Sequence, residues 1–213
     1  MPWQPRKKAR LWKRAARDFY LEPADCTAAL LRVEALDGEI WDPACGVGHV
    51  VATLRAAGRN AYGTDCMRRV PEATPWFLAE HDFLGEAVWP SRPDHIVCNP
   101  PFGRGLTAEA FIRQALGLAR RSVAVFVDYR FLASARRWTG LFREHPPARA
   151  WLLYPRPSCP PGDYLLGGGR AEGGTADFVW LVWECGRAGP LQFAGLDRRP
   201  PPEPATPALS EAA

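Results

Sequence analysis

The chain has 213 residues and a mass of 23.6 kDa. That length suits one domain with its own hydrophobic core and excludes two full domains. Hydrophobic residues make up 47% of the chain and charged residues 23%, as in an ordinary water-soluble protein. It contains no run of about 18 uncharged apolar residues, and its first residues lack the apolar run of a secretion signal. We therefore expect a cytoplasmic protein without a membrane partner.

The six cysteines follow neither a metal-binding nor a disulfide pattern. They are Cys26, Cys45, Cys66, Cys98, Cys159 and Cys185. No two of them have the C-x-x-C spacing, and none is grouped with the four histidines. The sequence therefore predicts free thiols, no zinc site and no disulfide framework.

Basic residues gather near the N-terminus. The net charge is only +4, but residues 6–17 contain several Lys and Arg and no acid. Two interpretations stay open: a solvated tail, or an arm that contacts nucleic-acid phosphates, with Trp3 and Trp12 offering rings for base stacking. We divide the chain into a basic N-terminal arm (1–17), a folded domain (18–190) and a Pro-rich disordered tail (191–213).

Helical and extended patterns alternate from about residue 24, which is typical of a parallel sheet wrapped by helices. The predicted helices cover residues 25–36, 49–57 and 107–119. The predicted strands cover residues 39–41, 61–63, 76–79, 95–98, 122–127, 150–154 and 177–183. The helix that Thr107 would cap is the clearest, because its apolar residues recur at i, i+3, i+4 and i+7. Between the last two strands, the Pro- and Gly-rich residues 156–175 predict a long mobile loop.

Polar side chains follow four successive predicted strands. Asp42, Asp65, Asp82 and Asn99 each stand at or just beyond a strand end. In an open parallel sheet, ligands bind beyond the carboxyl ends of the strands. Asp and Asn also serve as ordinary turn formers, but four in succession around a glycine loop indicate a binding site.

The glycine turn at Gly46-x-Gly48 indicates close approach of a ligand to the backbone, at the start of a helix with free N–H groups. A dinucleotide fits poorly, because Val51 occupies the place of the third glycine. Asp42, four residues before the turn, would also repel a pyrophosphate. A cationic ligand fits better, and the sulfonium and ammonium groups of S-adenosylmethionine meet that requirement.

The tetrapeptide Asn99-Pro100-Pro101-Phe102 is the strongest signal in the sequence. The two prolines stiffen the segment and remove two backbone donors, which leaves carbonyls to face a ligand. The Asn99 side-chain oxygen and the Pro100 carbonyl could both accept from one amino group and free its lone pair for attack on a methyl group. Phe102 offers a face on which a planar substrate can stack. No metal and no general base enter this chemistry.

These motifs resemble those of the class I S-adenosylmethionine-dependent amino-methyltransferases, and their order resembles that of bacterial and phage DNA N6-adenine methyltransferases. The resemblance implies a doubly wound, Rossmann-like α/β sheet, mostly parallel, with one antiparallel strand near the C-terminus. It implies S-adenosylmethionine as cofactor and DNA as partner. It assigns catalysis to Asn99, Pro100, Pro101 and Phe102.

The same resemblance assigns cofactor contacts. The implied residues are Phe19, Asp42, Pro43, Ala44, Gly46, Gly48, Asp65, Asp82 and Phe83. Phe19 belongs to a segment that closes over the methionine end of the cofactor in that group. Asp65 would bind the ribose hydroxyls and Asp82 the adenine amino group, with Phe83 packed on the adenine ring.

Two departures from that group concern the substrate. The chain has no room for a separate target-recognition domain, and Cys159 follows Arg156-Pro157-Ser158 where an aromatic residue is often found. Arginines between residues 128 and 175 offer another source of specificity. The alternatives are methylation of RNA, methylation of protein glutamine, and an inactive module that binds the cofactor and nucleic acid.

Overall fold

The computed structural model describes residues 18–201 except 86–88, 90, 104–105, 172, 175 and 188. The basic N-terminal arm and the last part of the expected tail lie outside these residues. Within the described chain, no helix combines the length and the apolar character needed to cross a membrane.

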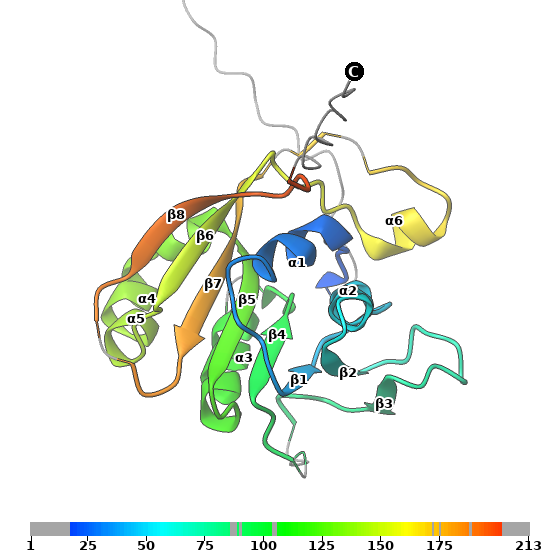
Figure 1. The fold of residues 1–213 in the computed structure, drawn as a ribbon, viewed down its shortest axis with the longest axis horizontal. Coiled ribbons are helices and arrows are strands. Elements are labelled where there is room, and N and C mark those ends of the chain that lie inside the picture. The colour runs from blue at the N-terminus through cyan, green and yellow to red at the C-terminus, as the bar shows by residue number, and fades with distance from the viewer. Residues whose placement is uncertain are drawn as a thin grey trace, which may run out of the picture.

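The described chain builds one eight-stranded sheet with the strand order β3-β2-β1-β4-β5-β7-β6-β8 (Figure 1). The strands are β1 (Glu39–Asp42), β2 (Asn60–Asp65), β3 (Phe77–Glu80), β4 (His95–Cys98), β5 (Ser122–Asp128), β6 (Arg149–Tyr154), β7 (Phe178–Glu184) and β8 (Gln192–Asp197). Only β7 runs against its neighbours, since it pairs antiparallel with β5 and β6, while every other pairing is parallel. The expectation of a mostly parallel sheet with one antiparallel strand near the C-terminus is confirmed.

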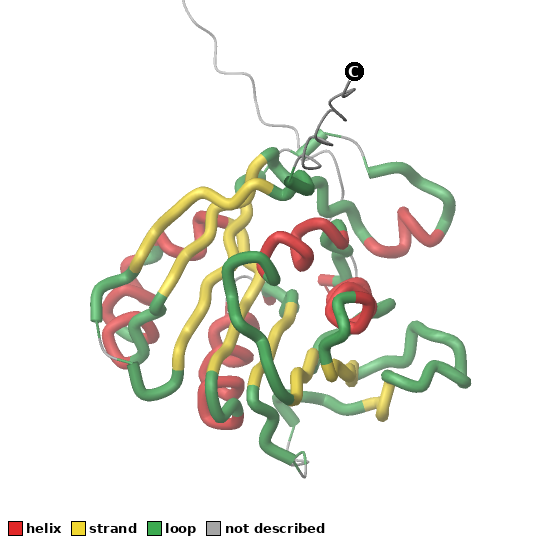
Figure 2. The backbone as a smooth tube through the Cα atoms, in the orientation of Figure 1, coloured by secondary structure: helices red, strands yellow, loops and turns green. Residues whose placement is uncertain are grey.

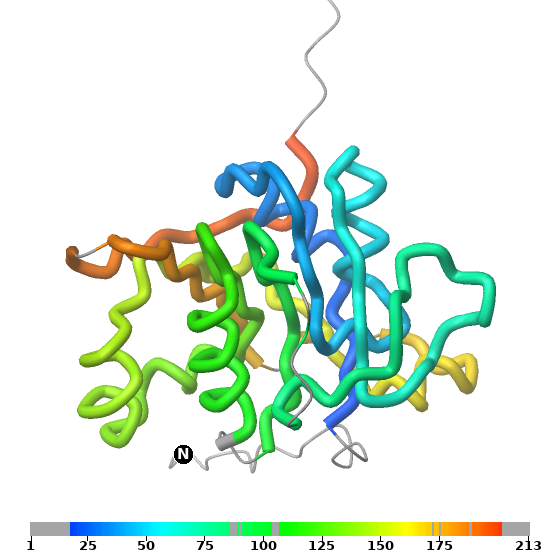
Figure 3. Tube along the Cα trace, turned by 90° about the horizontal axis from the view of Figure 1, so that it is seen from below, coloured from blue at the N-terminus to red at the C-terminus, as the bar shows by residue number. Residues whose placement is uncertain are grey.

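Helices cover both faces of this sheet (Figure 3). They are α1 (Ala24–Leu30), α2 (His49–Ala56), α3 (Leu106–Leu118), α4 (Ala135–Thr139), α5 (Leu141–Glu144) and α6 (Gly162–Leu166), with a 3-10 helix, η3 (Tyr129–Ala133), after β5. Helices α1 and α2 pack on one face, and α3 packs with α5 on the other. The expected doubly wound arrangement is therefore observed.

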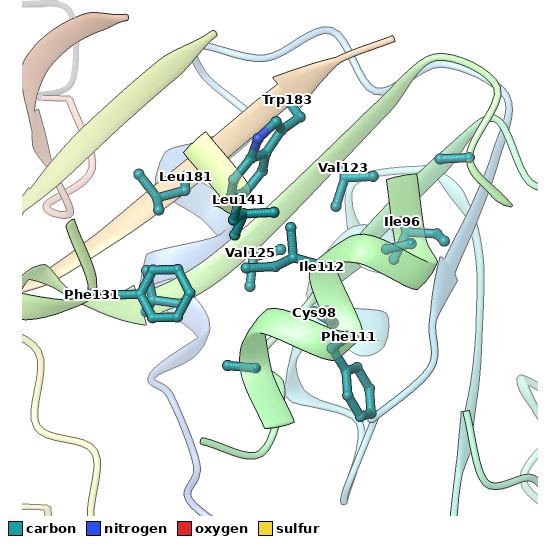
Figure 4. Packing of buried hydrophobic residues seen from close by; sticks show 14 of the residues in the cluster. Ile96, Cys98, Phe111, Ile112, Val123, Val125, Phe131, Leu141, Leu181 and Trp183 are labelled. Carbon is teal, nitrogen blue, oxygen red and sulfur yellow. The ribbon is translucent and has the colours of Figure 1, made fainter. Parts of the chain in front are cut away.

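The central strands β4 and β5 are buried along almost their whole length because both of their faces are covered. All four residues of β4 are buried, as are the first six of β5. Figure 4 shows Ile112 of α3 packed against Val123 and Val125 of β5. This is the face that the apolar stripe of the helix predicted.

The first helix is shorter than expected, because α1 ends at Leu30 instead of continuing to residue 36. Glu34, which the helical pattern included, turns towards β6. Its carboxylate accepts from Arg149 Nε at 2.6 Å and from Trp151 Nε1 at 2.7 Å. This buried interaction ties the end of α1 to the sheet and outweighs the helical preference of the segment.

The expected tail at 191–213 begins too early, because β8 (Gln192–Asp197) extends the sheet beyond residue 190. Its first four residues are exposed, so no apolar alternation marked it as a strand. Its position comes instead from backbone pairing with β6. The expected loop at 156–175 also contains a short helix, α6 (Figure 2).

The core packing predicts that replacing a buried tryptophan costs much more stability than replacing an exposed one. Trp180 is fully buried, contacts Phe126 edge-on with ring centroids 5.3 Å apart, and donates to the Cys26 carbonyl at 3.0 Å. Trp180→Ala should lower the free energy of unfolding by about 3–5 kcal/mol. Trp138, which is 70% exposed, is the matched control, and Trp138→Ala should change it by less than about 0.5 kcal/mol. Urea unfolding of both variants measures the difference, and equal losses would contradict this core.

Candidate active site

A pocket opens at the carboxyl ends of β1, β2 and β4. Strand β1 lies between β2 and β4, so the chain changes direction across the sheet here, and such switch points form crevices in open α/β sheets. The lining residues are 18–22, 42–46, 49, 65–66, 69, 81–84, 99, 101, 107 and 111. They enclose about 840 Å³ of empty space, a figure that includes the open mouth of the pocket.

Most of the residues expected at a cofactor site line this pocket. They are Phe19, Asp42, Pro43, Ala44, Gly46, Asp65, Asp82 and Phe83, together with Asn99 and Pro101 of the tetrapeptide at residues 99–102. Gly48, Pro100 and Phe102 do not line it. Phe102 is half-buried and packs against the core on the α3 face of the sheet.

The two glycines of the turn serve different purposes. Gly46 lies in the pocket wall with φ 56°, and its N–H donates to Asp65 Oδ2 at 2.9 Å. Gly48 has φ 88° and begins α2, and a Cβ at this position would lie 2.1 Å from the Trp76 ring. Gly48 is therefore required by the turn and by the packing of Trp76, whereas Gly46 shapes the pocket itself.

Asp65, at the end of β2, accepts hydrogen bonds from several groups. Besides the Gly46 amide, its carboxylate accepts from Met67 N at 3.1 Å and forms an ion pair with Arg69 Nη1 at 2.7 Å. The Arg69 guanidinium also lies over the Phe19 ring, 4.4 Å from its centroid. No sequence pattern identified Arg69 as a site residue, because only the fold brings it beside Phe19.

Three buried carboxylates make the inner end of the pocket electronegative. Asp42 is 2% exposed, Glu22 5% and Asp65 6%. Burial raises the pKa of Asp42, and the nearby charges of Glu22 and Asp65 raise it further, against a hydrogen bond from the Ala44 amide to Oδ1 at 3.0 Å. Such a site favours a cationic ligand, because positive charge offsets the cost of burying carboxylates.

Asp82 and Phe83 also line the pocket. Asp82 is exposed, and its Oδ1 accepts from the Leu84 amide at 3.2 Å. Phe83 is almost fully buried and packs between Trp41 and Phe111, with ring centroids 5.3 Å and 4.8 Å away. Core aromatics thus hold the Phe83 ring at the pocket wall.

The Asn99 side chain is anchored through its nitrogen. Nδ2 donates to Glu22 Oε2 at 2.7 Å and to the Tyr20 carbonyl at 3.2 Å. Four residues further on, the Gly103 amide donates to Asp18 Oδ2 at 2.7 Å. The turn that follows β4 is therefore joined at both ends to residues 18–22.

Residues 18–22 are held on their other side by the loop after β6. Leu21 N donates to the Pro160 carbonyl at 3.3 Å, and Gly162 N donates to the Phe19 carbonyl at 2.9 Å. The Phe19 ring sits so close to Gly162 that a Cβ there would lie 2.1 Å from it. This segment, which we call the strap (residues 18–22), crosses the pocket between the Asn99 turn and residues 160–162. The sequence could not indicate that clamp, since its two sides lie far apart in the chain.

Cys45 and Cys66 line the pocket, and Cys98 precedes Asn99 at the end of β4. Cys45 and Cys98 are buried, and burial raises the pKa of each thiol. Cys66 also lines the pocket but is exposed. Among the residues that the structure describes, no group of three His, Cys, Asp or Glu side chains could hold a metal ion.

No protein-family model and no curated protein matches this chain. Solved structures do. A candidate RNA methyltransferase from Pyrococcus horikoshii has a TM-score of 0.60 and 15% identity over 84% of this chain and 90% of its own. A candidate class I S-adenosylmethionine-dependent methyltransferase from Listeria monocytogenes has a TM-score of 0.56 and 14% identity, over 82% of this chain and 65% of its own.

A third similar structure is the modification subunit of a candidate type I restriction enzyme from Vibrio vulnificus. It has a TM-score of 0.52 and 16% identity, over 83% of this chain and 46% of its own. This chain thus spans less than two thirds of the Listeria and Vibrio proteins. The shared feature of all three is the arrangement of the sheet and its helices. The chain has the class I methyltransferase fold.

The buried carboxylate of Asp42 should lower the stability of the folded protein at neutral pH. Because the pKa of Asp42 is raised in the folded protein, its ionised form costs stability at neutral pH, and that cost disappears below the ordinary pKa of 3.8. Asp42→Asn should therefore raise Tm at pH 7 by a few degrees, and the gain should shrink as the pH falls towards about 4.

Thermal melts between pH 4 and 8 would test this, with Asp94→Asn as the control of opposite sign. A hydrogen bond from the Glu39 amide lowers the pKa of Asp94, so that variant should lose stability at pH 7. An unchanged Tm for Asp42→Asn at pH 7 would contradict a buried charge at this position.

Proposed function

We propose that this chain is an S-adenosylmethionine-dependent methyltransferase that methylates an exocyclic amino nitrogen, with N6 of adenine in DNA as its target. The observation that carries the proposal is the anchored Asn99 side chain. Both hydrogen bonds of its Nδ2 go to the strap, so Oδ1 is the atom left to accept from a substrate amino group. It stands beside a pocket with the charge that a sulfonium cofactor requires.

The pocket residues fit S-adenosylmethionine. Asp42 and Glu22 place negative charge at the inner end of the pocket, where the cationic methionine end would lie. Asp65 Oδ1 already accepts from Met67 and Arg69, but Oδ2, which accepts from the Gly46 amide, can still accept from a ribose hydroxyl. The exposed carboxylate of Asp82 would accept from the adenine amino group. The likeness to the Listeria protein, named as S-adenosylmethionine-dependent, agrees with this cofactor.

The chain's own residues would act by positioning. The bound cofactor would supply a methyl group on its sulfonium. Asn99 Oδ1 and the Pro100 carbonyl would accept from the substrate amino group and turn its lone pair towards that methyl group. The strap would cover the cofactor and help to exclude water from the reacting atoms. Phe102 would need to turn from its core contacts to stack on the target base.

DNA as the substrate rests on three observations. The motif order resembles that of DNA adenine methyltransferases, and the Vibrio protein is named as a modification subunit of a restriction enzyme. The basic arm (residues 1–17) joins the described domain at Asp18, which contacts Gly103 in the Asn99 turn. A phosphate-binding arm would therefore start beside the reacting groups.

RNA is a second candidate substrate. It is favoured by the likeness to the Pyrococcus protein, which is named as an RNA methyltransferase and matches over most of both chains. An exocyclic amino group of an RNA base would use Asn99 in the same way, so the two substrates differ only in what binds the rest of the polymer.

Cofactor binding predicts unequal roles for Asp65 and Asp82. Asp82→Ala should weaken binding of S-adenosylmethionine by about 1–3 kcal/mol through loss of one acceptor, while Tm stays near the wild-type value because the side chain is exposed. Asp65→Ala should weaken binding and also lower Tm, since Gly46 and Arg69 lose their partner. Calorimetry and thermal melts measure both quantities. Wild-type affinity in both variants would contradict the cofactor site.

Catalysis predicts that Asn99→Ala strongly lowers turnover without unfolding the domain. Loss of a preorganised polar contact should lower kcat by on the order of a hundredfold, whereas cofactor affinity should change little. Tm should fall, because the buried Glu22 carboxylate loses the donor Asn99 Nδ2, but the variant should still fold. The assay is transfer of labelled methyl groups to bulk DNA, RNA and protein, followed by digestion and analysis of the product. N6-methyladenine from DNA is the expected product.

The outcomes of this assay separate the candidates. Labelled RNA bases or protein glutamine alone would keep the chemistry and replace the substrate. A stable Asn99→Ala variant with wild-type turnover would refute the mechanism.

A further inference from the structure

Glu22 is a buried carboxylate that the resemblance to known methyltransferases does not explain. It is 5% exposed, and burial raises the pKa of its carboxyl group. In the described part of the chain, no Lys, Arg or His forms an ion pair with it. A buried charge without a cationic partner is costly. The hydrogen-bond partners of the Glu22 carboxylate therefore indicate its role.

The side-chain contact of Glu22 is with Asn99. Oε2 accepts from Asn99 Nδ2 at 2.7 Å, and this hydrogen bond opposes the effect of burial on the pKa. His49 is close, but its Nδ1 contacts the backbone carbonyl of Glu22 at 2.8 Å and not the carboxylate. The nearby Asp42 adds further negative charge. The Asn99 amide is thus the main group that stabilises this carboxylate, with smaller contributions from a backbone hydrogen bond and from the charge of His49.

The direction of the Asn99 amide decides whether it can bind a substrate amino group. An asparagine side chain carries an acceptor oxygen and a donor nitrogen of nearly the same shape. If the amide turned by 180°, Oδ1 and Nδ2 would exchange places. Nδ2 would then face the substrate amino group, and two hydrogen-bond donors cannot bind each other. The Tyr20 carbonyl and the Glu22 carboxylate can only accept hydrogen bonds, and both lie on the same side of Asn99. They exclude the turned orientation.

We propose that Glu22 is a positioning residue that fixes the Asn99 amide with Oδ1 directed at the amino group to be methylated. The inference rests on the proposed function, but it is independent of which polymer carries that amino group. A charge-assisted hydrogen bond is stronger than a neutral one, which gives the ionised form of Glu22 an advantage over glutamine. Glutamine could also donate to Oδ1 and so stabilise the turned orientation.

Two substitutions separate positioning from a simple effect of charge. Glu22→Asp keeps the negative charge near the cofactor but is one methylene too short to reach Asn99 Nδ2. Glu22→Gln keeps the reach and loses the charge. If Glu22 positions Asn99, both should lower kcat by about tenfold, and Glu22→Asp should leave the dissociation constant of S-adenosylmethionine unchanged. Glu34→Gln, a change of another buried glutamate far from the pocket, is the matched control and should keep wild-type kcat.

The measurements are kcat on whichever polymer the wild-type chain methylates, calorimetry with S-adenosylmethionine, and Tm. In an Asn99→Ala background, Glu22→Asp should cause no further loss of the residual turnover, because both residues act as one unit. Wild-type kcat in Glu22→Asp, or a full additional loss in the Asn99→Ala background, would overturn the inference and leave the proposed function intact. A wild-type chain that methylates none of the polymers would overturn both.

Discussion

The hydrogen bond from the Gly46 amide to the Asp65 carboxylate joins the loop after β1 to the end of β2, and the rest of the pocket depends on it. The same carboxylate binds Arg69, whose guanidinium lies over the Phe19 ring of the strap. One buried acid thus sets the backbone of the glycine turn and the position of the segment that crosses the pocket. A parallel sheet makes this possible, because it brings the ends of neighbouring strands to one edge.

The parts of the site that the sequence predicted are those with a local signature. Asp42, Asp65 and Asn99 stand where apolar strand patterns stop, and the glycines and prolines beside them restrict the backbone. Once the alternation of helix and strand indicates a parallel sheet, these residues must meet at one edge. Gly48 and Phe102 show the limit of this reasoning. Both belong to the motifs, but one accommodates Trp76 and the other packs against the core.

The parts that the sequence did not predict depend on contacts between distant residues. Glu22 and Asn99 are 77 positions apart, and the clamp on the strap comes from residues 160–162, inside a segment whose Pro and Gly content indicated only a loop. Strand β8 was missed for a related reason. Its place in the sheet comes from backbone pairing with β6, and an edge strand with exposed side chains carries no apolar pattern.

The contrast among the cysteines gives the pocket a natural place for a chemical label. Burial keeps the Cys45 and Cys98 thiols protonated and shielded from reagents, and reactivity of a thiol requires an accessible thiolate. Cys66 lines the pocket, as Cys45 does, but it is exposed, next to Asp65 at the end of β2. A maleimide dye attached at Cys66 would sit at the mouth of the pocket. Its fluorescence would then report occupancy of the site directly, without a turnover assay and without knowledge of the substrate.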